Sequence, residues 1–360
     1  AFGGPAAAIA MMRQEFVLRR KWLSEDDFFY LLGMTNLIPG PNATELAIHL
    51  GYRQGGWSGL ILAGVSYILP AMAIVLGFAW SYERWGTLPA MDGVLYGIKP
   101  VVIAILVAAL YGMLKPRLKR LDGLLVAAGV LTAYLLGLSP LVLLLGGGAV
   151  LLAWRLLRGN VLPLVAVSGI EWARVSAQPI SPEGFSLLRL FWVFLKAGAL
   201  MYGSGYVLLA FIQDDLVNRL GWLTQSQLLD AIAVGQVTPG PLSTTATFVG
   251  YLTGGWPAAL LATLAMFLPG FIFVAFTHPL LRWLRKSEHA GGFLDGVNFA
   301  ALGLMAGVTW EIGAEALVDP LSGGMGLAAL FLLLRFEVSA PWLILGGGSI
   351  GLIRTVFFGG

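Results

Sequence analysis

The chain has 360 residues, of which 58% are hydrophobic and 11% are charged, and its mean hydropathy is +0.83. A soluble domain carries about 25% charged residues, so the composition excludes an ordinary soluble protein. The net charge of +3 reflects Lys and Arg in short loops, where such residues set membrane topology, and does not indicate nucleic acid as a partner. The absence of cysteine excludes disulfides, thiolate metal sites and thiol redox chemistry.

Apolar runs near the length of a membrane-spanning helix recur along the chain. A helix needs about 20 residues to cross the hydrocarbon core of a bilayer. Runs of this kind occupy residues 57–80, 94–114, 121–138, 141–154 and 256–276. We therefore predict an all-α polytopic integral membrane protein, embedded in a lipid bilayer, with no cofactor or metal site. The chain opens on Ala1 and runs directly into apolar sequence, so we expect further residues upstream.

The chain contains an internal repeat. Short motifs of the first half recur in the second half in the same order, first 200 and then 199 residues later. The matched motifs include Trp22-Leu23-Ser24 with Trp222-Leu223-Thr224, Pro39-Gly40-Pro41 with Pro239-Gly240-Pro241, Gly51-Tyr52 with Gly250-Tyr251, and Gly55-Gly56-Trp57 with Gly254-Gly255-Trp256. We therefore divide the chain into a first repeat at 1–157, a polar cytoplasmic linker at 158–186 and a second repeat at 187–360.

The loop charges predict that the two repeats have opposite orientations in the membrane, because positive loops face the cytoplasm. Residues 115–120 carry four Lys or Arg residues, whereas the equivalent residues 310–320 carry none and are expected to form an acidic, solvated outer loop. The loop at 80–92 has a single basic residue, Arg84, whereas its counterpart in the second half is basic. The difference in positive charge between the halves is therefore reversed at this loop. Inverted repeats require an odd number of crossings in each half. In the first half we expect five, near residues 1–20, 57–82, 93–114, 121–138 and 140–157.

That count leaves residues 25–50 as a re-entrant helical hairpin that returns to its own side of the membrane. Its first helix is predicted from Glu25 to Ile38, and these 14 residues reach about 21 Å, which is short of a core of roughly 30 Å. Ser24 is placed to cap this helix, and Thr224 with Gln227 has capping-box spacing at the equivalent place. Each hairpin turns at Pro-Gly-Pro, and inversion would let the two tips meet near the membrane midplane.

The Pro-Gly-Pro turns predict an anion site. Proline cannot continue the incoming helix, glycine permits a tight turn, and Pro41 suits the first position of the outgoing helix. Each turn presents a helix N-terminus, with N–H groups and the positive end of a dipole, as broken helices do in inverted-repeat transporters. The alternative is a simple kink with hydroxyl groups that pack helices together. The candidate residues are the breaking prolines Pro39, Pro41, Pro239 and Pro241 and the substrate-binding positions Asn36, Gly40, Asn42, Ala43, Thr44, Gln236, Gly240, Ser243 and Thr244.

Four ionisable residues are further candidates. Lys99 and Lys196 are substrate-binding candidates, because a cation inside a crossing helix is costly and usually functional. The alternatives are that Lys99 snorkels to the interface and that Lys196 pairs with an acidic residue elsewhere. Glu45 and His49 share one helix face and are candidates for carrying a coupling proton. The alternative for this pair is a structural hydrogen bond.

Two glycine runs lie at equivalent positions of the halves, Gly146-Gly147-Gly148 and Gly346-Gly347-Gly348. Both runs lie within apolar segments, where small residues let helices approach each other closely. We therefore predict that these glycines mediate helix packing rather than phosphate binding. The chain also has no P-loop motif, so we do not expect ATP to drive this protein.

Taken together, these motifs resemble the chromate ion transporter family in its two-domain form. The resemblance rests on Phe2-Gly3-Gly4-Pro5, Asn36-Leu37-Ile38-Pro39-Gly40-Pro41-Asn42, Gly51-Tyr52-Arg53, Gly235-Gln236-Val237-Thr238-Pro239-Gly240-Pro241 and Phe267-Leu268-Pro269. It covers nearly the whole chain. Membership would imply export of chromate from the cytoplasm across the bacterial inner membrane. Sulfate is the natural mimic, because both ions are tetrahedral dianions.

We therefore predict a secondary transporter, and not an enzyme, that exports chromate or a sulfate-like oxyanion. The driving force would be the membrane potential, proton or anion exchange, or both. The alternatives are an anion channel, a transporter of a different oxyanion and, with less support, an intramembrane enzyme acting on lipid phosphates. That enzyme would need a nucleophile–base pair or a carboxylate metal cluster, and the sequence shows neither. The coupling ion and the oligomeric state stay open, with a homodimer as one assembly.

Overall fold

The computed structural model describes residues 4–35, 38–86, 88–157, 184–202, 205–286 and 288–358, and every regular element within these ranges is a helix. Gly4 and Pro5 begin the first of these helices. Phe2, Gly3 and Asn36 lie outside the described residues, as does nearly all of the expected linker 158–186. The roles predicted for them therefore stay predictions.

Helices suit this apolar chain, because lipid offers no hydrogen bonds and a helix satisfies its own backbone groups. The first half holds α1 (Gly4–Arg13), η1 (Gln14–Arg19), α2 (Glu25–Thr35), α3 (Asn42–Trp85), α4 (Pro89–Leu114), η2 (Lys115–Arg117), α5 (Leu121–Leu135) and α6 (Pro140–Leu157). The second half holds α8 (Leu187–Leu200), α9 (Val207–Ile212), η3 (Gln213–Arg219), α10 (Gln225–Val237), η4 (Leu242–Thr244), α11 (Thr245–Lys286), α12 (Glu288–Ala316), α13 (Pro320–Phe336) and α14 (Ala340–Phe358).

Six of the described helices are long and apolar enough to cross a membrane, namely α3, α4, α6, α11, α12 and α14. The apolar helices α5 and α13 are shorter. This confirms the prediction of an all-α polytopic membrane protein. The expected crossing near 1–20 is shorter than predicted. It forms α1 and η1, which cover 10 and 6 residues, and η1 is polar at Gln14 and Glu15.

Two other predicted boundaries differ from the structure. The first hairpin helix, α2, ends at Thr35 rather than at Ile38, because the residue before a proline avoids the helical region and Ile38 precedes Pro39. The expected outer loop at 310–320 is mostly helix, since α12 continues to Ala316. The acidic side chain of Glu311 is therefore part of a helix and half-buried, and it accepts a hydrogen bond of 2.9 Å from Tyr134.

A glycine pair divides each long helix that follows a Pro-Gly-Pro turn. In α3 the backbone leaves the helical conformation at Gly55 and Gly56, and in α11 it does so at Gly254 and Gly255. The second glycine of each pair has a positive φ, 57° and 67° respectively. The break separates a short segment that belongs to the hairpin from a long segment that crosses the bundle. The return of each hairpin to its own side of the membrane stays a prediction.

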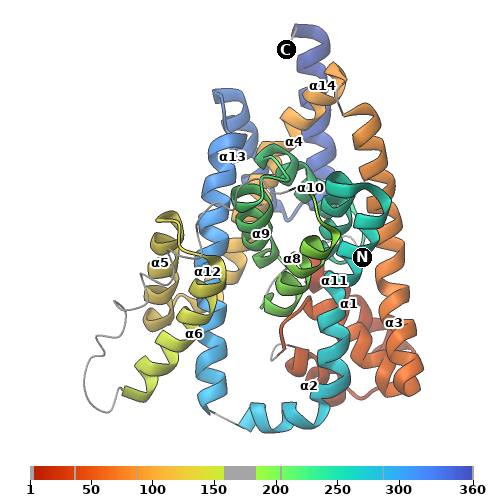
Figure 1. The fold of residues 1–360 in the computed structure, drawn as a ribbon, viewed down its shortest axis with the longest axis vertical. Coiled ribbons are helices and arrows are strands. Elements are labelled where there is room, and N and C mark those ends of the chain that lie inside the picture. The colour runs from red at the N-terminus through yellow and green to blue at the C-terminus, as the bar shows by residue number, and fades with distance from the viewer. Residues whose placement is uncertain are drawn as a thin grey trace.

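One long helix of each half packs on helices of the opposite half. The helix α4 packs along α13 and α14, and α12 packs along α5 and α6, so each long helix lies on the last two helices of the other half (Figure 1). Glycines permit the contact, as predicted for the glycine runs. A Cβ on Gly97 would overlap the carbonyl oxygen of Gly347, and a Cβ on Gly296 would lie 2.5 Å from that of Gly147.

The helices α3 and α11 lie against each other and run in opposite directions (Figure 1). In that view α3 rises from the lower end toward the top, and α11 descends to the lower end, where α12 begins. This arrangement is compatible with inverted repeats. The orientation of each half relative to the two sides of a membrane stays a prediction.

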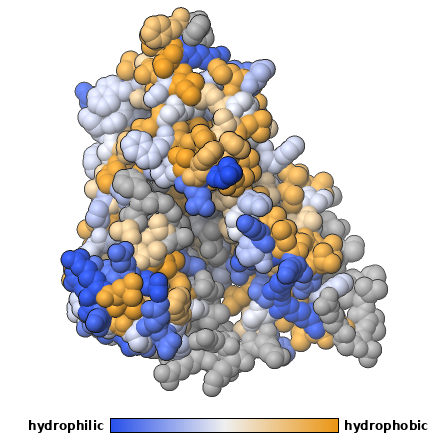
Figure 2. All heavy atoms as spheres, turned by 180° about the vertical axis from the view of Figure 1, so that it is seen from behind, coloured by the Kyte–Doolittle hydropathy of each residue, from blue (hydrophilic) through white to orange (hydrophobic). Residues whose placement is uncertain are grey.

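The outer surface carries many large apolar side chains. Leu62 of α3 and Leu264 of α11 are 69% and 57% exposed, and Trp342 of α14 is 71% exposed. On the face shown in Figure 2, hydrophobic residues cover most of the upper part, and hydrophilic residues gather in two groups near the lower end. Apolar exposure on this scale is expected where lipid rather than water surrounds the helices.

Candidate functional site

The first Pro-Gly-Pro turn forms a tight link between α2 and α3. Gly40 has a φ of 145°, which L side chains rarely adopt. Its N–H donates a hydrogen bond of 2.6 Å to the carbonyl oxygen of Met201, in the link between α8 and α9. Pro41 has an extended backbone, and α3 begins at the next residue, Asn42. The tip is thus fixed to the second half of the chain at its central glycine.

The second turn has a similar conformation at its central glycine, but it leads into the 3-10 helix η4 before α11 begins. Gly240 has a φ of 142°. The preceding helix, α10, begins with the predicted capping box of Thr224 and Gln227. A Cβ on Gly240 would lie 2.5 Å from the Cβ of Ala71, so this tip packs on α3 beside Pro70. Each tip therefore contacts the opposite half of the chain.

Met201 brings the two tips together. Its carbonyl oxygen binds the first tip, and its sulfur lies 3.9 Å from the hydroxyl oxygen of Ser243, just after the second tip. Both Met201 and Ser243 are fully buried. Met201 therefore contacts both turns, and the meeting of the tips near the membrane midplane stays a prediction.

The hydroxyl groups of the two tips differ in their hydrogen bonding. Thr244 and Thr245 donate to the carbonyl oxygens of Pro241 and Leu242, at 2.8 and 2.7 Å, so their hydroxyl protons are engaged within the turn. The hydroxyl of Thr44, in the first turn of α3, is buried and has no hydrogen-bond partner in the described part of the chain. Its proton is available to a ligand that reaches the first tip.

Glu45 folds back over the first tip. Its side chain is fully buried, and neither carboxylate oxygen has a hydrogen-bond partner among the described residues. One of these oxygens occupies the space that a Cβ on Gly40 would need. The same carboxyl group faces Gly270 of α11, whose Cβ would lie 3.9 Å from it. His49, one turn further along α3, is also buried.

The other candidate residues lie apart from this meeting point. Lys99 donates a hydrogen bond of 2.7 Å to the hydroxyl of Ser226, at the start of α10. Lys196 forms an ion pair with Asp215 of η3, which matches the alternative expected for this lysine. The amide of Gln236 donates to the hydroxyl of Tyr206 at 3.0 Å. Neither lysine is paired with a group of the two tips.

Sequence reasoning missed two residues that shape the site, Met201 and Gly270. Met201 is not polar, and it contributes through its backbone carbonyl, which any residue type could supply. For Gly270 a signal existed. It follows Pro269, the repeat counterpart of Pro70, and Pro70 precedes Ala71 where the second tip packs. The repeat therefore indicated where each tip would meet the opposite long helix.

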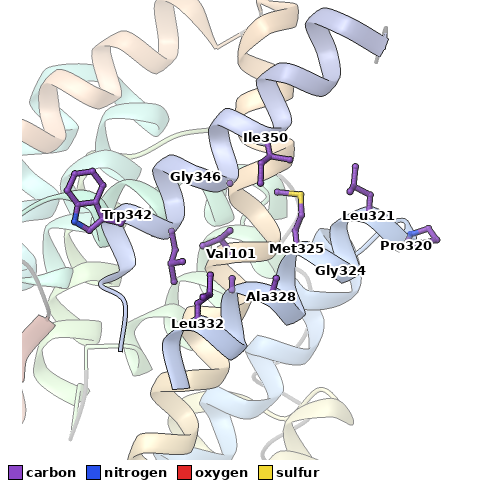
Figure 3. A pocket seen from close by; sticks show the side chains of 13 residues that line it. Val101, Pro320, Leu321, Gly324, Met325, Ala328, Leu332, Trp342, Gly346 and Ile350 are labelled. Carbon is purple, nitrogen blue, oxygen red and sulfur yellow. The ribbon is translucent and has the colours of Figure 1, made fainter. Parts of the chain in front are cut away.

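Two crevices in the described surface are apolar. One, of about 400 Å³, lies between α4, α13 and α14 and is lined by residues such as Val101, Met325 and Trp342 (Figure 3). Another, of about 580 Å³, lies between α3 and α11 and is lined by residues such as Trp57 and Phe271. Neither lining includes a charged side chain.

Charged groups at the ends of the bundle are paired. Arg53 donates to Asp27 at 2.7 Å, and this guanidinium, with a further hydrogen bond from Ser24, holds the pKa of Asp27 below its ordinary value. At another helix end, the backbone N–H of Ser322 and the hydroxyl of Tyr96 lower the pKa of Asp319. Arg53 is therefore engaged at the surface and not at the tips.

The bundle of long apolar helices, with two Pro-Gly-Pro turns inside it, is that of a polytopic membrane protein. A sequence profile described as "Chromate transporter" matches residues 1–152 and 188–352. The chain belongs to the chromate transporter family.

Relatives named as transport proteins resemble it over most of their length. A "Chromate transport protein" of Cupriavidus metallidurans is 33% identical over 98% of this chain and 89% of its own length. A "Chromate transport protein" of Pseudomonas aeruginosa is 33% identical over 98% of this chain and 88% of its own length. A "Probable chromate transport protein" of Synechococcus elongatus is 32% identical over 91% of this chain and 85% of its own length. No solved structure matches. The family and these names place the chain among transport proteins and not among enzymes.

Proposed function

We propose that the protein exports chromate from the cytoplasm across the bacterial inner membrane, through a site formed by the two Pro-Gly-Pro tips. The family supports a role in chromate transport. The observation that carries the site is the first turn of α3, where the buried hydroxyl of Thr44 has no hydrogen-bond partner among the described residues, beside a tip fixed to the second half.

The chemistry of the tips suits a tetrahedral dianion. The first turn of an α-helix leaves its N–H groups without partners inside the helix, and its dipole favours negative charge. The start of α3 supplies such N–H groups at Asn42 and Ala43, together with the Thr44 hydroxyl, and Ser243 lies across from them beside Met201. Sulfate has the same shape and charge as chromate, and we propose it as a second substrate.

Export of a dianion follows from the membrane potential. A potential that is negative inside contributes roughly 2.3 kcal/mol per charge per 100 mV to the exit of an anion. Glu45 and His49, buried in α3 beside the first tip, are the residues through which proton coupling would act. A channel at the same tips is the competing proposal, and flux that saturates at low substrate concentration would count against it.

Flux of radiolabelled sulfate and chromate into proteoliposomes tests the proposed site. We expect saturable flux for the full chain and at least a tenfold loss in Asn42→Leu and Ser243→Leu, because leucine removes a polar group next to each tip. Asn298→Leu and Ser349→Leu are matched controls, since among the described residues these side chains hydrogen-bond to carbonyl oxygens of their own helices. Equal flux in all four variants would sink the paired-tip site, and no flux of either anion in folded protein would sink the function.

A further inference from the structure

Glu45 lies where the first tip would receive its anion. An anion at this helix N-terminus would approach Gly40 and the Thr44 hydroxyl, and the Glu45 carboxyl group is already against Gly40. Side chains in a helix lean toward its N-terminus, which explains why Glu45 reaches back over the turn that precedes it. An ionised Glu45 and a dianion would therefore occupy the same small space.

The surroundings of Glu45 offer nothing that stabilises a negative charge beyond the helix start itself. The side chain is fully buried, and neither oxygen accepts a hydrogen bond from a described residue. The opposite long helix α11 presents Gly270. The titratable groups around it are Tyr202, from the link between α8 and α9, and His49 on its own helix. A buried carboxylate without a partner is costly, and a second negative charge beside it costs more.

We propose that the tip binds its oxyanion only when Glu45 carries a proton, so that one proton crosses the membrane with each dianion. This inference rests on the proposed function. The proposed cycle requires the emptied site to return with Glu45 ionised, next to the N–H groups and the positive dipole end at the start of α3, and in that state the site carries one negative charge. In the loaded site Glu45 is neutral and the dianion contributes two. Loading therefore adds one negative charge to the site rather than two, and the transported unit is the dianion together with one proton.

The same arrangement explains how one site can both attract and release a dianion. Protonated Glu45 can donate a hydrogen bond to an oxyanion oxygen, next to the unbonded Thr44 hydroxyl. Loss of the proton converts this donor into a negative charge at the same position, which expels the anion. The second tip has Thr245 at the equivalent position, and its hydroxyl is engaged with Leu242. The first tip is thus the one that senses protons.

The equilibrium distribution of labelled sulfate across proteoliposomes measures the charge that moves per anion. With a potassium gradient and valinomycin, a potential of about 60 mV supports a tenfold gradient for each net charge moved. We expect the full chain to reach about a tenfold gradient and Glu45→Gln, which keeps the shape but cannot ionise, to reach about 100-fold. Glu337→Gln, at the exposed end of α13, is the matched control and should behave as the full chain.

A pH gradient gives the second readout. At zero potential, one pH unit should accumulate sulfate about tenfold on the alkaline side in the full chain and not in Glu45→Gln, because a cotransported proton carries its own gradient into the equilibrium. A 100-fold gradient per 60 mV without pH dependence in the full chain would overturn the inference and leave the proposed function intact. Accumulation on the acidic side would show exchange and would also overturn it. If Glu45→Gln does not fold, the full chain alone still decides between these outcomes.

Discussion

The two Pro-Gly-Pro turns have similar central glycines but differ in the residues that follow them. Gly40 and Gly240 have φ values within a few degrees of each other, 145° and 142°, and each tip packs on the long helix of the other half. After the first tip comes Glu45, buried and unbonded, and after the second comes Thr245, bonded to its own turn. A helix begins after each turn, α3 at Asn42 and η4 at Leu242, and in our proposal only the first of these two positions responds to protons.

The largest effect is expected from adding a methyl group at the tip glycines. Gly40→Ala and Gly240→Ala both force an unfavourable φ, which costs on the order of 1–3 kcal/mol, and we expect flux to fall at least tenfold in each. The two differ in what the methyl group meets, a carboxyl group at the end of a side chain in the first and the Cβ of Ala71 in the second. Ala71→Gly should therefore restore part of the flux of Gly240→Ala and none of that of Gly40→Ala. Equal restoration would contradict this packing.

The hairpins also differ in how they are attached to the bundle. The helix α10 of the second hairpin is held by a part-buried hydrogen bond, which Tyr82 donates to Asp230 at 2.8 Å, whereas the helix α2 of the first is held by surface ion pairs such as that of Arg53 with Asp27. Tyr82→Phe leaves a buried carboxylate without its donor and should destabilise the protein by about 1–3 kcal/mol. Arg53→Gln should cost less. Thermal unfolding in detergent measures both.

Salt and pH separate these two attachments. The effect of Arg53→Gln should shrink at about 1 M salt, where charges are screened beyond roughly 3 Å, and that of Tyr82→Phe should not. Because Arg53 lowers the pKa of Asp27 in the folded protein, its contribution is present above the ordinary pKa of an aspartate. It is lost as the pH falls through the lowered value. A salt-sensitive Tyr82→Phe would show that the second attachment is open to solvent.

The smallest effects are expected from removing the threonine hydroxyl groups that follow the two turns. Thr244→Val removes a hydrogen bond and should cost about 1 kcal/mol of stability, whereas Thr44→Val removes a buried hydroxyl that has no partner among the described residues and should cost nothing or stabilise slightly. For sulfate flux we expect the reverse order, with a rise in KM for Thr44→Val and little change for Thr244→Val. Matching losses in stability and flux would mean that Thr44 is structural.

Local rules made the tips predictable from the sequence. Proline and glycine act on their own backbone, so the turns at Gly40 and Gly240 and the capping box of Thr224 follow from residue types and spacing alone. The end of α2 obeys the same kind of rule, but the predicted boundary at Ile38 ignored the restriction that Pro39 imposes on the residue before it. In this chain, the residues that interrupt helices also locate the site.

Partners far along the chain were not predictable. The acceptor of the Gly40 N–H is Met201, and the acidic partner of Lys196 is Asp215, and both depend on how helices assemble in three dimensions. The same is true of Glu45, for which sequence spacing showed a shared face with His49 but not the absence of a hydrogen-bond donor among the described residues. A sequence pattern indicates which interactions a side chain can make. The partner of that side chain depends on how the helices pack.

The exchange of helices between the halves has a consequence for biosynthesis. The face of α4 that carries Gly97 fits closely against Gly347 of α14, which is made roughly 250 residues later. At about 5–20 residues per second, the ribosome needs on the order of tens of seconds to supply that partner. During this interval α4 must remain in the membrane with an unfilled groove. A membrane insertion factor that binds single helices would therefore remain bound to this protein until its last helix has been synthesised.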